Sequence, residues 1–280
     1  MNSLEIKNLT KTYRDFTLDH ISFCLPEGCI MGFVGENGAG KSTTIKLILN
    51  MIQADGGEVS IFGQSNQVDL KAKKENIGVV LDEIGFPECI SAKELNNVLR
   101  YAYENWDTEV YTGYLEKFKL PLNKPFKEYS RGMKMKLGIT AALSHHAKLL
   151  ILDEATSGLD PVVREEVLDI LNEFTREENH SVLISSHIVS DLERLCDYIA
   201  FLHKGRLVLC DEKDRLLEHY GMVHCTHEQF KRLDANIVVG KKESHYGIEA
   251  IMERINIPDN MKISPIGIED LFVYMAKERN

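Results

Sequence analysis

The chain has 280 residues, of which 44% are hydrophobic and 27% charged, so it resembles an ordinary globular protein with room for one large domain and a small one. A net charge of −10 excludes a global basic field, and we expect no nucleic-acid partner. No apolar run approaches the ~20 residues that span a bilayer, the start lacks signal-peptide features, and six scattered cysteines indicate reduced thiols, a cytoplasmic protein and no zinc site.

The first part of the chain predicts an antiparallel β-layer that leads into a buried strand. Residues 4–9 and 18–25 alternate between apolar and polar side chains, as half-exposed strands do, and residues 58–63 return as a further strand. Residues 29–34 (CIMGFV) form a short apolar run that is typical of a buried strand. Residues 44–51 have helical spacing, and a turn at residues 55–57 closes this helix.

The stretch between that buried strand and that helix, Gly35–Thr43 (GENGAGKST), fits the phosphate-loop pattern G-x-x-x-x-G-K-[ST]. Its glycines let backbone N–H groups turn inward, and the helix N-terminus adds partial positive charge. Lys41 can then reach the β- and γ-phosphates, and the Ser42 hydroxyl can ligate Mg²⁺. The alternative is a glycine-rich turn that happens to precede Lys-Ser, but the strand–turn–helix context favours the phosphate loop.

The middle of the chain changes to helical character. The short basic cluster at residues 71–74 lies next to acids and is typical of a solvated face, and residues 77–81 predict a buried strand. Residues 85–145 predict an inserted helical subdomain. Its helices begin at a capping box, Ser91–Glu94, and continue over residues 109–119 and 132–143.

Two acids follow the next apolar strand. Residues 148–152 end at Asp153 and Glu154, a helix follows over residues 161–177, and residues 181–186 form a buried strand that ends at His187. Alternating strands and helices predict a mostly parallel sheet, whose strand ends face the ligand crevice. We expect Asp153 to serve Mg²⁺ and Glu154 to accept a proton from water, rather than merely to mark a strand end.

The last third of the chain carries no phosphate-binding or catalytic motif. Residues 198–209 predict a hairpin, and residues 213–280 a small α+β appendage. In its clearest helix, Ile268, Leu271, Phe272 and Met275 share one face. This stripe either docks on the main domain, which we favour, or binds a partner.

Over residues 4 to about 210, the order of these motifs resembles the nucleotide-binding subunit of an ATP-binding-cassette (ABC) transporter. Tyr129–Met133 (YSRGM) resembles the family's signature, usually LSGGQ, and Ser157–Asp160 (SGLD) matches the loop after the catalytic acid. His187 matches the switch histidine, and Tyr13 the aromatic that stacks on adenine. Taken alone, Ser130 would be a helix cap, His187 a structural histidine and Tyr13 a packed loop aromatic.

The resemblance implies an α/β phosphate-loop cassette over residues 1–212, with mostly parallel core sheet, antiparallel layer and helical subdomain, followed by the appendage at 213–280. It implies an ATPase that binds ATP and Mg²⁺ in a head-to-tail homodimer or heterodimer and powers export of a drug, antibiotic or peptide. The permease would be a separate membrane chain, which places the subunit at the inner face of the membrane. The alternatives are a soluble ABC-type ATPase switch on a cytoplasmic assembly and a non-catalytic nucleotide-binding regulator.

The expected site divides into three groups. The catalytic residues are Glu154, His187 and Lys41, and the metal is served by Ser42, Asp153 and Asp82. The nucleotide-binding residues are Tyr13, Gly35, Glu36, Asn37, Gly38, Ala39, Gly40, Lys41, Ser42, Thr43, Ser130, Gly132 and Asp160.

Two positions depart from the family pattern. Arg131 replaces a glycine of the signature, and either adds a cation near the phosphates or faces solvent. Asp82, followed by Glu83, stands where the family has glutamine, so it either approaches Mg²⁺ or water, or lies on a plain surface loop.

Overall fold

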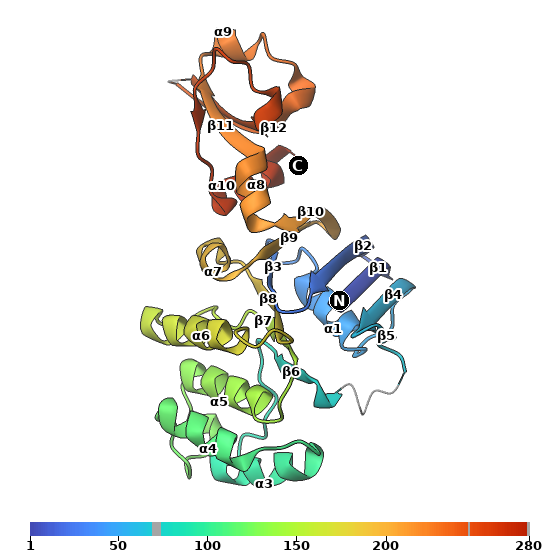
Figure 1. The fold of residues 1–280 in the computed structure, drawn as a ribbon, viewed down its shortest axis with the longest axis vertical. Helices are drawn as coiled ribbons and strands as arrows, with labels where there is room; N and C mark the ends of the chain where they lie inside the picture. Colours follow the sequence, from blue (N-terminus) through green and yellow to red (C-terminus); the bar gives the residue numbers. More distant parts are fainter. Residues whose placement is uncertain (69–73, 246, 279–280) are drawn as a thin grey trace.

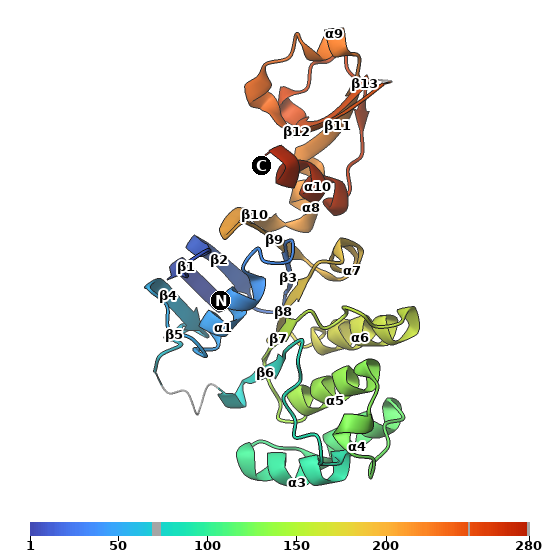
Figure 2. The ribbon, with the colours of Figure 1, turned by 180° about the vertical axis from the view of Figure 1, so that it is seen from behind.

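The computed structural model describes residues 1–68, 74–245 and 247–278, so residues 71–73 of the basic cluster lie outside the described residues. Figure 1 shows an elongated molecule, with the C-terminal residues at one end, a mixed α/β core in the middle and a block of helices at the other end. Figure 2 shows the same order from behind, with α1 between the N-terminal sheet and the core sheet.

The core is a sheet with strand order β10-β9-β3-β8-β7-β6, parallel throughout except for the edge strand β10. In that order its strands are β10 (Arg206–Glu212), β9 (Tyr198–His203), β3 (Ile30–Val34), β8 (Ser181–Ser186), β7 (Leu149–Asp153) and β6 (Ile77–Val80). Every residue of β3, β7 and β8 is buried, as expected for parallel strands covered on both faces. The predicted parallel sheet and the hairpin of β9 and β10 are confirmed.

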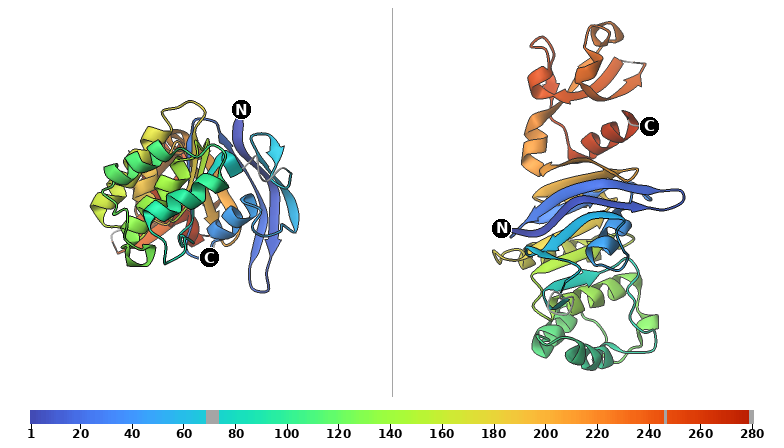
Figure 3. Two further views of the ribbon diagram at one scale, coloured as in Figure 1. Left: turned by 90° about the horizontal axis from the view of Figure 1, so that it is seen from below. Right: turned by 90° about the vertical axis from the view of Figure 1, so that its right-hand side faces the viewer.

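The predicted antiparallel layer is also present and covers one side of the core (Figure 3). Its strands, in sheet order, are β2 (Thr17–Pro26), β1 (Asn2–Thr12), β4 (Gly56–Ile61) and β5 (Gln64–Ser65). A hydrophobic cluster formed by this layer, α1 (Lys41–Ile48) and one face of the core sheet holds them together. Burying such side chains stabilises the layer by roughly 1.5–3 kcal/mol for each large residue.

The helix after the phosphate loop ends earlier than the sequence predicted. It stops at Ile48 rather than about residue 51, because Asn50 has a left-handed backbone (φ 53°). The side chain of Asn66 donates to the carbonyls of Leu47 and Ile48, which satisfies two acceptors at this helix end.

The helical block follows β6. It contains α3 (Ala92–Ala102), α4 (Thr108–Lys117), the 3₁₀ turn η1 (Phe126–Glu128) and α5 (Arg131–Leu143). The capping box predicted at Ser91 is present, because its hydroxyl accepts from the Glu94 N–H while the Glu94 carboxylate accepts from the Ser91 N–H. The remaining helices beside the core are α6 (Pro161–Phe174) and α7 (Val189–Leu195).

The chain after β10 forms a further antiparallel sheet with strand order β12-β13-β11-β14 and its own hydrophobic cluster. Its elements in chain order are α8 (Lys213–His219), β11 (Tyr220–Cys225), α9 (His227–Phe230), η2 (Ala235–Ile237), β12 (Val238–Ser244), β13 (Gly247–Glu253), η3 (Arg254–Asn256), β14 (Ile263–Ser264) and α10 (Ile268–Glu278). The stripe on α10 packs toward the core, because Phe272 lies 4.6 Å, centroid to centroid, from Phe201 of β9. The prediction that this stripe docks on the main domain is confirmed.

Candidate functional site

The phosphate loop leaves the end of β3 and turns directly into α1. Gly40 takes the cap position of α1 with a left-handed backbone (φ 111°), which glycine adopts without a Cβ penalty. Within the described residues no side chain caps α1, and its first turn holds no acid. Its first N–H groups and its partial positive charge therefore suit an anion such as a phosphate.

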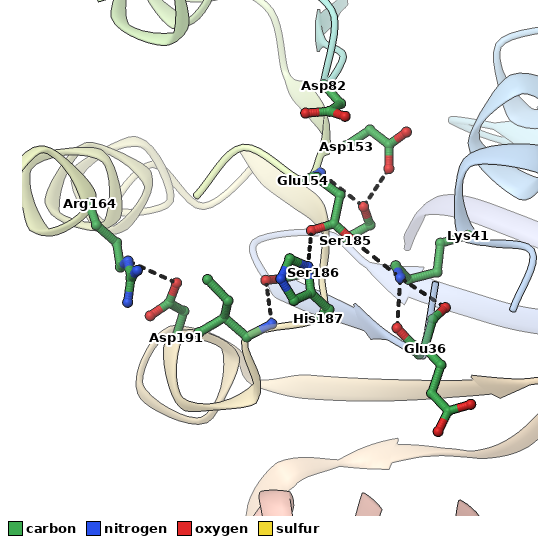
Figure 4. A network of polar contacts seen from close by, with 12 residues as sticks. Glu36, Lys41, Asp82, Asp153, Glu154, Arg164, Ser185, Ser186, His187 and Asp191 are labelled. Atoms are coloured by element: carbon green, nitrogen blue, oxygen red, sulfur yellow. Dashed lines mark hydrogen bonds and ion pairs between the residues drawn. The ribbon is translucent and has the colours of Figure 1, made fainter. Parts of the chain in front are cut away.

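Lys41, the first residue of α1, is 5% exposed although it carries a charge. Its Nζ donates to the Gly35 carbonyl at 2.6 Å and to the Glu36 carbonyl at 3.3 Å. The same Nζ lies 3.2 Å from Oε1 of Glu154. Figure 4 shows this cation folded over its own loop toward the acids.

The two acids are held by a serine from the neighbouring strand. The Ser185 hydroxyl donates to Oδ1 of Asp153 at 2.6 Å and accepts from the N–H of Glu154 at 3.1 Å. Glu154 has a left-handed backbone (φ 54°), which is uncommon for a residue with a side chain and costs of order 1 kcal/mol or more. Ser185 thus fixes one acid through its carboxylate and the other through its backbone.

His187 follows β8 and completes the arrangement. Its Nδ1 lies 2.6 Å from Oε2 of Glu154, so Nδ1–H donates to the carboxylate. The Ser186 hydroxyl accepts from the Ile188 N–H at 2.9 Å and steadies the turn that carries the histidine. Figure 4 shows Glu154 between Lys41 on one side and His187 on the other.

A cavity of about 580 Å³ opens beside Lys41 and Glu154. It is lined by Asp15, Phe16, Glu36, Asn37, Gly38, Gly40, Lys41, Ser42, Thr43, Asp82 and Glu154. Loop amides and a lysine suit phosphate, while hydroxyl and carboxylate oxygens are the donors that Mg²⁺ prefers. The residues present therefore fit a magnesium nucleotide.

The predicted residues of the signature and of the loop after the acids lie elsewhere. Ser130 caps α5, where its hydroxyl accepts from the Met133 N–H, and Asp160 caps α6, where its carboxylate accepts from two N–H groups. Gly132 lies against α6, because a Cβ built on it would be 3.3 Å from Val163. None of these three is among the described residues that line the cavity.

The aromatic predicted to stack on the base, Tyr13, is 44% exposed, and the Nζ of Lys11 lies 5.8 Å from its ring centroid. In the described chain, the aromatic side chain that lines the cavity is Phe16. The backbone N–H of Tyr13 donates to the Phe16 carbonyl at 2.8 Å, so the two belong to one turn. Sequence reasoning passed over Phe16, although an aromatic three residues after Tyr13 was a usable signal.

Comparisons with known proteins address the family directly. The family described as "ABC transporter" matches residues 18–157. An uncharacterized ABC transporter ATP-binding protein of Bacillus subtilis is 33% identical over 98% of this chain and 96% of its own length. The chain belongs to the ABC transporter ATP-binding proteins. It is therefore an ATP-binding and ATP-hydrolysing subunit, as the motif order implied, and the alternative of a soluble switch is not favoured.

Other ABC relatives carry more specific names. A bacitracin transport ATP-binding protein of Bacillus licheniformis is 33% identical over 88% of this chain and 80% of its own length. A lantibiotic transport ATP-binding protein of Streptococcus pyogenes is 34% identical over 75% of this chain and 91% of its own length. A solved ABC transporter ATP-binding subunit, 29% identical, superposes with a TM-score of 0.70 over 76% of this chain and 91% of that one.

These comparisons confirm the predicted cassette fold and ATPase class. ABC ATP-binding subunits work with membrane permease components. Across the residues that the structure describes, no helix has both the length and the apolar character to cross a bilayer.

Proposed function

We propose that this ABC subunit powers the export of an antibiotic or peptide-like compound through a permease that is a separate membrane chain. The names of the bacitracin and lantibiotic transport relatives support this substrate class, while export is the direction that the sequence resemblance implies. In this proposal the subunit is cytoplasmic and lies at the inner face of the membrane, held there by its permease. The division at about residue 212, with an α+β appendage of unassigned role, is part of the same proposal.

The observation that carries the catalytic part is the position of Glu154 between Lys41 and His187, at 3.2 Å and 2.6 Å. Lys41 exchanges its contacts with its own loop and with Glu154 for phosphate oxygens, which frees one carboxylate oxygen. Glu154 then accepts a proton from the attacking water, and His187 keeps the carboxylate oriented. Binding of the phosphates rests on the amides of residues 35–43 and on Lys41.

Mg²⁺ would be held by the Ser42 hydroxyl and by Asp153 acting through water, and Asp82 lines the same cavity as Ser42. When bound, the ion would supply positive charge that neutralises the phosphates. Support for the role of Asp153 is its 2.6 Å bond from Ser185, which leaves the second carboxylate oxygen available.

We further propose a head-to-tail dimer, with either an identical or a related subunit. Ser130, Gly132 and Asp160 would meet the nucleotide of the partner subunit, since none of them is among the described residues that line the chain's own cavity. The exposure of the Ser130 and Asp160 side chains at two helix N-termini supports this assignment. Tyr13, or Phe16 beside it, would face the base.

Purification from detergent-solubilised membranes tests the transport role. We expect a tagged chain with Glu154→Gln to bring down one polytopic membrane protein, and reconstitution with that protein to give transport that needs wild-type Glu154. Recovery of a ribosomal or other soluble assembly, with no membrane protein, would contradict the proposal.

A further inference from the structure

The chain's two departures from the family pattern, Asp82 and Arg131, contact one another. Asp82 lies two residues after β6, whereas Arg131 is the first residue of α5. The Arg131 Nη2 donates to Oδ1 of Asp82 at 2.8 Å. The side chains of Arg131 and Asp82 are 53% and 51% exposed, so the fold does not require this pair for its core.

Asp82 lines the nucleotide cavity, as do Lys41, Ser42 and Glu154. Figure 4 shows Asp82 on the same side of the site as Asp153. The lining of the cavity also includes the carboxylates of Asp15, Glu36 and Glu154. Among the described residues that line the cavity, Lys41 alone carries a positive charge. Left unpaired, the Asp82 carboxylate would repel the phosphates, and the Arg131 guanidinium neutralises it.

Arg131 also needs an acid, because it stands in the first turn of a helix, where the macrodipole disfavours a cation. The first turn of α5 holds no acid of its own among the described residues. Asp82 supplies that charge from another segment. Arg131 and Asp82 therefore each offset the electrostatic cost of the other. The family's usual glycine at position 131 and glutamine at position 82 are uncharged and carry no such cost.

The guanidinium lies beside a third segment, the loop between β7 and α6. A Cβ built on Gly158 would be 3.2 Å from Cζ and 3.3 Å from Nε of Arg131. Gly158 has a left-handed backbone (φ 66°). The Arg131 side chain thus binds the loop after β6 and lies beside the loop after β7.

We propose that Arg131 is a positioning residue for the ATPase reaction of this chain. It cancels the charge of Asp82 at the nucleotide cavity and holds the loop that carries it. This inference rests on the proposed nucleotide site. Its specific consequence is that the need for Arg131 depends on the charge at position 82.

The experiment is a double-mutant cycle with Arg131→Ala and Asp82→Asn, read as kcat and KM for MgATP. With Asp82 in place, we expect Arg131→Ala to raise KM by about tenfold, because a carboxylate is left unpaired beside the phosphates. In the Asp82→Asn background, we expect the same substitution to change KM by less than about twofold. Equal factors in both backgrounds, or no effect with Asp82 in place, would overturn the proposal.

Matched controls separate this effect from loss of structure and from failure of the site. Lys117→Ala removes a comparably exposed pair with Glu173, far from the cavity, and should leave KM unchanged. Thermal unfolding midpoints of all variants should agree within a few degrees, since exposed pairs add little stability. If Glu154→Gln hydrolyses ATP like wild type, the proposed site is wrong. If Glu154→Gln is inactive but the Arg131→Ala and Asp82→Asn effects on KM are additive, only the proposed role of Arg131 is wrong.

Discussion

The Nδ1 atom of His187 lies 2.6 Å from Oε2 of Glu154, and this contact joins the ends of two parallel strands. Strand β8 brings the histidine and strand β7 brings the acid, so the sheet register sets their distance. The hydrogen bond from the histidine fixes the orientation of the Glu154 carboxylate. The contact supports the proposed role of His187 in hydrolysis over that of a structural histidine.

Replacing His187 by alanine should lower kcat by about a hundredfold and change KM for ATP little, because the histidine acts on the reacting geometry. Phosphate release and equilibrium nucleotide binding measure the two quantities. His219→Ala, at a histidine 3.3 Å from Glu253 in the C-terminal region, is the control. A variant that binds and hydrolyses like wild type would contradict the role of His187.

Lys41→Ala should weaken nucleotide binding by about a hundredfold or more, because in the proposed site the buried ammonium is the cation that contacts the phosphates. Isothermal titration with a magnesium nucleotide measures the change. The variant also leaves Glu154 without its 3.2 Å partner, so circular dichroism should verify the fold. Wild-type affinity in a folded variant would argue against the loop assignment.

Ser185→Ala should reduce turnover and raise the Mg²⁺ concentration needed for half-maximal rate, each by roughly tenfold, since both acids lose a hydrogen bond. It should also cost about 1–3 kcal/mol of unfolding free energy. Ser181→Ala is the matched control, because Ser181 is equally buried on β8 and bonds to Ser3 at 2.9 Å. Ser181→Ala should lose similar stability but need the same Mg²⁺ concentration for half-maximal rate as wild type. If Ser185→Ala and Ser181→Ala showed the same Mg²⁺ dependence, the role of Ser185 would be contradicted.

His145 provides a prediction on pH. It is buried against Tyr103, with ring centroids 4.1 Å apart, and burial lowers its pKa below the usual 6.5. Below pH 6.5 the His145 side chain therefore takes up a proton more readily in the unfolded chain than in the folded chain. The stability that neutral His145 contributes is thus complete above pH 6.5 and is lost as the pH falls below that value.

Denaturant unfolding at several pH values tests this sign. His145→Gln should cost about 1–2 kcal/mol at about pH 7.5. It should also flatten the fall in stability between about pH 6.5 and 5.5, because glutamine does not titrate. An unchanged slope would show that His145 is not the group responsible.

Much of the fold could be predicted because its signals are local. The buried strands are short apolar runs, the Ser91 capping box lies within four residues, and the loop motif fixes its own strand–turn–helix context. The ends of helices are harder to predict, because they depend on contacts with residues distant in sequence. At the end of α1, a free carbonyl is satisfied by the side chain of Asn66, which lies 18 residues beyond Ile48.

The polar contacts between strands could not be read from the chain. Ser185 looked like an ordinary strand residue, and its bond to Asp153 exists only through the register of β7 with β8. The pairing of Arg131 with Asp82 joins residues 49 positions apart. The sequence marked both as departures, but only the fold shows that they meet.

The central claim is that two copies of this ABC subunit close on ATP and part when Glu154 promotes its hydrolysis. Light scattering of Glu154→Gln with saturating MgATP tests it most directly. We predict a particle of twice the 31.8 kDa chain mass, which reverts to the monomer when ATP is removed. A mass of one chain at saturating nucleotide would contradict the account.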